Sequence, residues 1–260
     1  MKNYSYFAIS DKGQIRKTNE DVFLADESLS LFAVADGVGG RAGGDLASAF
    51  IKEHFSKIVR NTLAKLSIEE VIFHSIVKLN EELLSEVKQV DSYYKNMSTT
   101  IISILLTDDG LANIGNLGDS RAYIIRGSGM TQLSKDHSLA QLLAENGSID
   151  AKDVKGHPTS NRLTQYVGMP GSVTPETSQI YLQKNDLLLL CSDGLTNMLV
   201  DGEINDILQS SKNAQEGCET LIKRANELGA RDNVTVIVVQ WLADVERQNE
   251  SLDSQTTINY

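Results

Sequence analysis

The sequence has little cysteine, no apolar segment long enough to cross a membrane, and no apolar leader at its start. Two cysteines, Cys191 and Cys218, are too few for a disulfide framework or a zinc cluster. Apolar runs such as Leu187 to Cys191 are far shorter than the roughly 20 residues of a membrane span. The polar first residues lack the apolar core of a signal peptide. We therefore expect a cytoplasmic protein with no membrane span, and a buried rather than a catalytic thiol at Cys191.

Basic residues are also scarce. The chain has 24 lysines and arginines against 35 aspartates and glutamates, a net charge of −11. A protein that binds nucleic acid needs a basic surface, so the composition argues against nucleic acid as the main partner. An acidic chain can simply be well solvated, or part of its acid can form a site for a cation.

The apolar pattern alternates between groups of strands and pairs of helices. Apolar, β-branched stretches bounded by turns predict strands at 29–35, 99–106, 111–117, 120–125, 179–182, 186–192 and 233–241. Helical spacing predicts helices at 45–64, 67–87, 137–145, 203–209 and 216–228, the second opened by a capping box between Ser67 and Glu70. This order predicts an α+β fold in which antiparallel sheets pack together under helix pairs.

One domain accounts for most of the chain. No internal repeat and no linker rich in glycine, serine or proline interrupts it. We assign residues 1–242 to the domain and predict that the polar residues 243–260 form a flexible tail.

Aspartates follow the apolar stretches at several places. They lie in Asn19-Glu20-Asp21, Asp36-Gly37, Gly118-Asp119-Ser120, Ser192-Asp193-Gly194 and Arg231-Asp232-Asn233. A carboxylate just beyond a strand is held by a rigid element and still reaches solvent. Converging carboxylates would repel and raise one another's pKa, and a divalent cation would remove that cost. Oxygen ligands favour Mg²⁺, Mn²⁺ or Ca²⁺ over zinc.

Each segment alone also has an ordinary explanation. Asp-Gly is a common turn dipeptide, and most such turns bind nothing. The glycines at 39, 40, 43 and 44 could form a phosphate loop, but no Walker pattern accompanies them.

The ordered set of segments resembles the type 2C metal-dependent serine/threonine protein phosphatases, in particular their compact bacterial signalling members. The resemblance spans about residues 5–242. The matching segments are Gly13-x-x-Arg16-x-x-Asn19-Glu20-Asp21, the run from Leu31 to Gly40 with Asp36-Gly37, Ser98-Thr99-Thr100, Gly115 to Arg121, Asp136-His137-Ser138, Leu190 to Leu195 and Asp232-Asn233-Val234-Thr235.

The resemblance implies a fold and a set of roles. The fold would be a sandwich of two antiparallel sheets with helix pairs on both sides, in four layers. By matching position, Asp36 would bridge two Mn²⁺ or Mg²⁺ ions, and Asp193 and Asp232 would complete the ligands of the first ion. The Gly37 carbonyl would bind the second ion, with Glu20 and Asp21 beside it. Asp119 would bind a third, weaker ion, and Arg16 would bind the substrate phosphate.

This site would hydrolyse phosphoserine and phosphothreonine by direct in-line attack of a water that the two ions activate. The planar guanidinium of Arg16 suits two phosphate oxygens, although a plain salt bridge to Glu20 or a neighbour would also explain it. Many eukaryotic members carry a histidine after Asp-Gly as a general acid, whereas this chain has Val38. A metal-bound water is our preferred acid, with His157 as a second candidate.

We expect phosphorylated proteins as partners, including a cognate serine/threonine kinase and its substrates, and a monomeric enzyme. A phosphatase of anti-sigma-factor antagonists is the alternative within the same chemistry. An inactive phosphoprotein-binding scaffold is disfavoured because Asp36, Asp193 and Asp232 are all present. A calcium-binding structural module is disfavoured because the carboxylates are spread along the chain.

Overall fold

The structure is a computed structural model that describes residues 2–38, 43–88 and 97–244. Nearly all of the predicted tail, 243–260, lies outside the described residues. Two five-stranded antiparallel sheets form the centre. The first has the order β1 (Tyr4–Asp11), β10 (Val234–Trp241), β9 (Leu187–Cys191), β6 (Arg121–Arg126) and β7 (Gly129–Gln132). The second has the order β2 (Asp21–Asp26), β3 (Leu31–Asp36), β4 (Ile101–Leu106), β5 (Leu111–Leu117) and β8 (Glu176–Tyr181).

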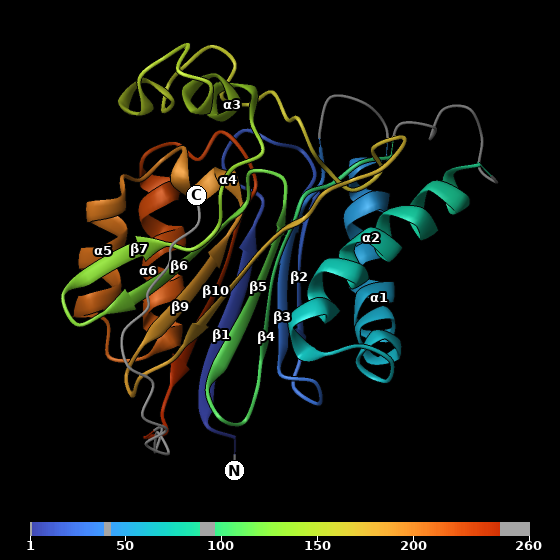
Figure 1. The fold of residues 1–260 in the computed structure, drawn as a ribbon. Helices are drawn as coiled ribbons and strands as arrows, with labels where there is room; N and C mark the ends of the chain where they lie inside the picture. Colours follow the sequence, from blue (N-terminus) through green and yellow to red (C-terminus); the bar gives the residue numbers. More distant parts are fainter. Residues whose placement is uncertain (1, 39–42, 89–96, 245–260) are drawn as a thin grey trace.

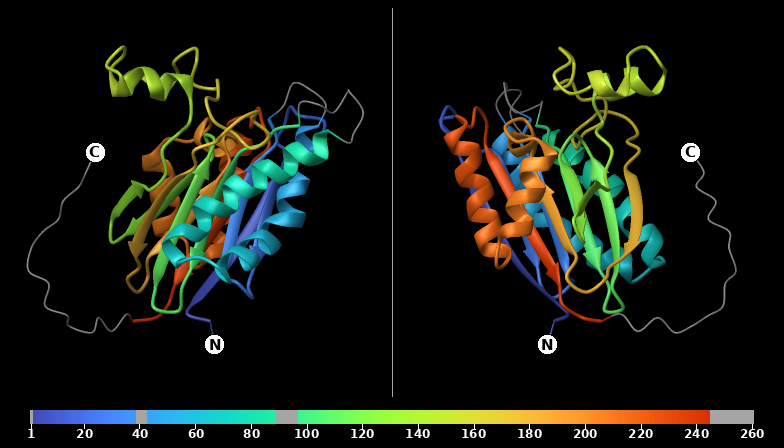
Figure 2. Two further views of the ribbon diagram at one scale, coloured as in Figure 1. Left: turned by 45° about the vertical axis from the view of Figure 1, so that its right-hand side comes forward. Right: turned by 90° about the vertical axis from the view of Figure 1, so that its left-hand side faces the viewer.

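Helices cover both outer faces of this sandwich, as Figure 1 shows. The second sheet packs under α1 (Gly44–Leu63) and α2 (Ile68–Val87), and the first under α4 (Asp193–Thr196), α5 (Asp201–Ser210) and α6 (Ala214–Glu227). The segment with α3 (Leu139–Glu145) and the short helix Ala151–Asp153 stands above one end of the sandwich in every view (Figures 1 and 2). We call residues 136–164 the flap. The predicted four-layer αββα fold is confirmed.

Buried apolar side chains on both faces of the strands explain the layering. Along β3, Phe32 and Val34 belong to the core between the sheets, whereas Leu31 and Ala33 belong to the core under α1 and α2. Side chains alternate between the two faces of a strand, so a strand in the middle of four layers must be apolar throughout. That requirement is why this stretch reads as a continuous apolar run.

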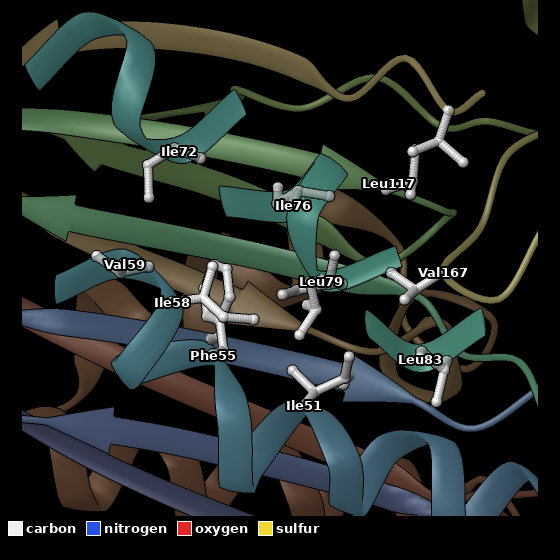
Figure 3. Close-up of a cluster of buried hydrophobic side chains, with 14 of the residues drawn as sticks. Ile51, Phe55, Ile58, Val59, Ile72, Ile76, Leu79, Leu83, Leu117 and Val167 are labelled. Carbon is white, nitrogen blue, oxygen red and sulfur yellow. The ribbon is translucent and has the colours of Figure 1, made fainter. Parts of the chain in front are cut away.

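The helix pair α1 and α2 packs on its sheet through large aliphatic and aromatic side chains. Phe55 of α1 and Ile76 and Leu79 of α2 point into one cluster, shown in Figure 3, and none of them is exposed to solvent. Gly115 of β5 allows this close approach, because a Cβ atom there would lie 2.1 Å from Cγ2 of Ile72.

The structure differs from the sequence prediction in a few local details. Strands β1, β2 and β7 and the four-residue α4 were not predicted from the sequence. The predicted capping box at α2 is wrong in form, because the Ser67 hydroxyl donates to the Glu70 carboxylate (2.9 Å) and makes no bond to the helix backbone. Among the described residues, no helix has the length and apolar character to span a membrane.

The topology brings the predicted site residues to one end of the sandwich. Asp36 ends β3 and Asp21 begins β2, while Asp193 follows β9 and Asp232 precedes β10. Asp119 lies in the turn from β5 to β6. Since neighbouring strands are antiparallel, the end of one lies beside the start of the next. The element ends that carry the five aspartates therefore meet at the end of the sandwich where α4 and the flap lie (Figure 1).

The core under α1 and α2 gives the first prediction. Replacing the fully buried Phe55 with alanine should lower the free energy of unfolding by roughly 3 to 5 kcal/mol, through lost burial and the cavity left behind. Urea denaturation measures the loss. Leu142→Ala, at a side chain 48% exposed on the flap, is the control and should change stability by less than about 0.5 kcal/mol. Equal losses in both variants would contradict this placement of the core.

Candidate metal centre

Asp36 is the centre of the carboxylate group. The strand register places Asp21 directly opposite Asp36. Burial raises the pKa of the Asp36 carboxyl group, and the charges of Asp21 and then Asp193 raise it further, so the three carboxyl groups lie close together. Ionised carboxylates that lie this close repel one another, so the group favours either a proton or a cation at its oxygens.

Threonines of the Ser98-Thr99-Thr100 segment hold the Asp36 backbone. The Asp36 N–H donates to the Thr100 hydroxyl (3.1 Å), and the backbone N–H of Thr100 donates to the Asp36 carbonyl (2.9 Å). Thr99 Oγ1 donates to the same carbonyl at 2.8 Å, and Thr100 Oγ1 pairs with the buried Ser120 hydroxyl at 2.7 Å. Asp36 is therefore fixed by the neighbouring strand and by the turn that carries Asp119.

Ser192 orients Asp21 from the other sheet. Its hydroxyl donates to Oδ2 of Asp21 (2.7 Å) and accepts the Thr235 N–H (3.0 Å). Asp193, the next residue, has its Oδ2 held by Nδ2 of Asn197 at 3.0 Å. Sequence reasoning did not assign a role to Thr100 or to Ser192. Both lie within the quoted segments, and a hydroxyl next to a candidate carboxylate was the available signal.

Burial raises the pKa of these carboxyl groups. Burial is the largest cause at Asp21, whose pKa rises to about 7, and it raises the pKa of Asp36 well above the ordinary value. The pKa of Asp193 is raised by burial and then by Asp232, and that of Glu20 by burial and then by Asp45. The sequence prediction named mutual repulsion as the cause, but removal from water contributes more.

Three carboxylate oxygens at this end of the sandwich are shielded from water and lack a hydrogen-bond partner within the described part of the chain. They are Oε2 of Glu20, Oδ1 of Asp21 and Oδ1 of Asp193. Buried oxygens of this kind are costly unless something positive binds them. Hard oxygen donors suit Mg²⁺ and Mn²⁺, so the residues present fit a divalent cation.

The side chains still need to adjust around an ion. Among the residues that the structure describes, no three His, Cys, Asp or Glu side chains already surround one point as a metal site does. One oxygen of Asp21 accepts from Ser192 and one of Asp193 accepts from Asn197, so binding would require the carboxylates to rearrange around the ion.

Glu20 and Gly37 lie beside the first turn of α1. The Gly37 N–H donates to the Glu20 carbonyl at 3.2 Å. A Cβ atom on Gly44 would lie 2.4 Å from Oε2 of Glu20, and a Cβ atom on Gly37 would lie 2.5 Å from the Gly44 carbonyl oxygen. Glycine at both positions lets the helix start, the loop and the carboxylate crowd together. The segment 39–42 between them lies outside the described residues.

Asp119 borders a pocket beneath the flap. Burial, followed by the charge of Asp193, raises its pKa well above the ordinary value. The pocket has a volume of about 50 Å³ and is lined by Asp119 and Asp193 on one side and by Lys155 and Asn161 of the flap on the other. The flap therefore closes over the part of the site where Asp119 lies.

Arg16 contacts a carboxylate in this structure. Its Nη2 donates to Oδ2 of Asp232 at 2.7 Å, and both side chains are partly exposed. The other oxygen of Asp232 accepts the Asn233 N–H at 2.9 Å. The alternative interpretation of Arg16 as a salt bridge thus describes its observed contact, but with Asp232 rather than Glu20. The phosphate role of Arg16 stays a prediction.

The remaining candidates are less central. The Val38 N–H donates to the Ser98 carbonyl at 2.9 Å, and His157 bonds to Thr159 in its own turn, so the identity of the general acid stays a prediction.

Cys191 and Cys218 are free and buried, and burial raises the pKa of each thiol to about 12. A thiol with such a pKa is a poor nucleophile near neutral pH, which agrees with the sequence analysis.

Comparison with known proteins identifies the family of this chain. The pattern of the protein phosphatase 2C family matches residues 7–234. The chain therefore belongs to the protein phosphatase 2C family. It is a metal-dependent serine/threonine protein phosphatase, an enzyme rather than an inactive scaffold.

Two proteins with similar sequences come from bacteria. The chain is 35% identical to the serine/threonine phosphatase stp of Listeria innocua, over 89% of this chain and 93% of that protein. It is 33% identical to the protein phosphatase PhpP of Streptococcus pneumoniae, over 89% and 95% of the two chains.

Solved structures agree. The Mycobacterium tuberculosis serine/threonine phosphatase PstP/Ppp superposes with a TM-score of 0.83 at 29% identity, over 92% of this chain and 99% of the other. The catalytic domain of PstP in complex with two manganese ions superposes with a TM-score of 0.77 at 28% identity, over 92% and 99%.

The pKa of Asp21 predicts how stability varies with pH. An unfolded aspartate has a pKa of about 3.9, so the folded protein keeps this proton to higher pH than the unfolded chain does. In the presence of a chelator, the contribution of Asp21 to the free energy of unfolding is therefore fully present below about pH 4. It falls, by up to about 1.4 kcal/mol per pH unit, as the pH rises through about 7. Asp21→Asn should flatten this decline, since the amide oxygen still accepts from Ser192.

Urea denaturation at several pH values with EDTA measures the effect. Asp108→Asn, at an exposed aspartate, is the matched control and should keep the wild-type slope. A wild-type protein whose stability does not fall between pH 5 and pH 8 would show that these carboxyl groups are not protonated in the fold.

Proposed function

We propose that the carboxylate group holds two Mn²⁺ or Mg²⁺ ions, with Asp36 between them. Asp193 and Asp232 would complete the ligands of the first ion. The Gly37 carbonyl would bind the second, with Glu20 and Asp21 beside it mainly through water. The observation that carries the proposal is the set of shielded, unpartnered oxygens on Glu20, Asp21 and Asp193. Asp119 would contribute to a third, weaker site beside the flap.

The chain's own residues prepare this site. Bound ions would supply a nucleophilic water at neutral pH and polarise the phosphoryl group. Thr100 holds the backbone of Asp36 and Ser192 holds the carboxylate of Asp21, so both residues are already positioned and only their side chains have to adjust on binding. Burial favours the protonated carboxyl groups, and an ion would favour the charged ones, so binding is expected to release protons.

Metal dependence is the direct test. EDTA should abolish hydrolysis of a phosphothreonine peptide, and Mn²⁺ or Mg²⁺ should restore it. Ca²⁺ should not, because it is larger and accepts looser geometry. Asp36→Asn should reduce turnover by at least about a hundredfold, and calorimetry should show weaker Mn²⁺ binding. Full activity in excess EDTA, or unchanged Mn²⁺ binding by the variant, would contradict the assignment.

Arg16 is proposed to bind the substrate phosphate. It stands beside Asp232, and in the observed ion pair only Nη2 donates, so the guanidinium retains further N–H groups for a dianion. The exposed pair with Asp232 contributes little to stability, because surface ion pairs are worth about 0 to 1 kcal/mol. Its placement is therefore better explained by function than by stabilisation.

Replacing Arg16 separates these roles. Arg16→Ala should raise KM for a phosphopeptide by roughly ten- to a hundredfold, with a fall in kcat if the contact strengthens in the transition state. Arg16→Lys should recover only part of the loss, since it lacks the planar fork. Melting curves accompany the kinetics. Normal kinetics with a lowered melting temperature would make Arg16 a structural residue.

We further propose that the enzyme reverses the action of a serine/threonine kinase, with that kinase and its substrates among its partners. Kinases use ATP inside the cell, which supports a cytoplasmic site of action. Large exposed apolar side chains in the described chain, such as Leu46, Leu142 and Tyr181, occur on separate elements rather than on one, which supports a monomer.

A further inference from the structure

The loop between β1 and β2, residues 12–20, carries both Arg16 and Glu20 but has little core of its own. None of its residues belongs to a helix or strand, and Ile15 in its middle is 69% exposed. Apolar packing therefore cannot fix it. Its order must come from hydrogen bonds, one of which joins the Gln14 N–H to the Ala230 carbonyl at 2.9 Å.

The side chain of Asn233 makes three further bonds to this loop. Its Oδ1 accepts the Glu20 N–H at 2.8 Å. Its Nδ2 donates to the carbonyl of Lys12 at 2.9 Å and to that of Thr18 at 3.0 Å. These contacts hold both ends of the segment that carries Arg16, and they use the acceptor and both donors of one amide.

Asn233 is itself held firmly. It is 4% exposed and directly precedes β10 in the first sheet. A Cβ atom on Gly194 would lie 1.9 Å from the Asn233 carbonyl oxygen, so this backbone packs against the start of α4 without room for a side chain. The amide is thus a rigid part of the frame that also carries Asp193 and Asp232.

We propose that Asn233 is a positioning residue for phosphate binding, which sets Arg16 in place by fixing its loop to the metal-site frame. This inference rests on the proposed phosphate role of Arg16. Aspartate has the same shape but cannot replace it. A carboxylate would keep an acceptor for Glu20 and would set an anion against the carbonyl oxygens of Lys12 and Thr18.

Binding of inorganic phosphate to the Mn²⁺-loaded protein, measured by calorimetry, tests the proposal without relying on turnover. Asn233→Asp should weaken phosphate binding by about tenfold, the usual effect of unsatisfied buried hydrogen-bonding groups. Asn113→Asp is the matched control. Asn113 is also buried, donates to the Leu105 carbonyl and accepts from Gln179, and lies toward the other end of β5. It should lower the melting temperature and leave phosphate affinity within about twofold.

A double-mutant cycle distinguishes positioning from general destabilisation. If Asn233 acts through Arg16, then Asn233→Asp should cost less than about twofold in phosphate affinity once Arg16 is alanine. Additive losses would overturn the proposal and leave Asn233 as a structural residue. If the aspartate variant does not fold, Asn233→Ser, which keeps a single hydroxyl, replaces it in the same cycle.

The outcomes also separate this inference from the proposed function. If Arg16→Ala binds phosphate as the wild type does, both the clamp and the role of Asn233 are refuted. If the wild type binds phosphate through the coupled pair but does not hydrolyse phosphothreonine peptide, the positioning role stands and the proposed catalytic assignment fails.

Discussion

The fold concentrates carboxyl groups where water is largely excluded, and much of the local structure can be understood from that constraint. Asp21, Asp36 and Asp193 lie close together at the end of the sandwich, and burial raises their pKa values. Such a group is unfavourable unless protons or cations neutralise it. The surrounding hydroxyl and amide groups satisfy some of the oxygens, and those left unsatisfied mark where a cation would bind.

Rigid elements from both sheets carry the group. Antiparallel pairing brings strand ends together, and the apolar layers between and outside the sheets fix those ends relative to each other. A site assembled this way is precise because its residues extend from strands, whereas the loop with Arg16 and the flap lie at the border of the site. This arrangement separates the rigid carboxylate site from the loop and the flap at its border.

The sequence predicted the main elements where packing leaves a strong pattern. The run 29–35 is apolar on both faces of β3, and the helices α1 and α2 bury one face each. It missed the edge strands β1 and β2, whose residues after the first are exposed or only partly buried, and β7, which is short and mostly exposed. It also missed α4, since Asp-Gly reads as a turn when its position in the fold is unknown.

The sequence by itself determined the family and the layered fold, through the resemblance of its ordered motifs. It also determined which aspartates to consider, because strand-end carboxylates are a local feature. Only the tertiary structure decided which groups meet. The hydrogen bond from Ser192 to Asp21, the ion pair of Arg16 with Asp232, and the bond from Asn233 to Thr18 join residues more than 150 positions apart. Spacing along the chain carries no information about such contacts, since they depend on how the two sheets pack.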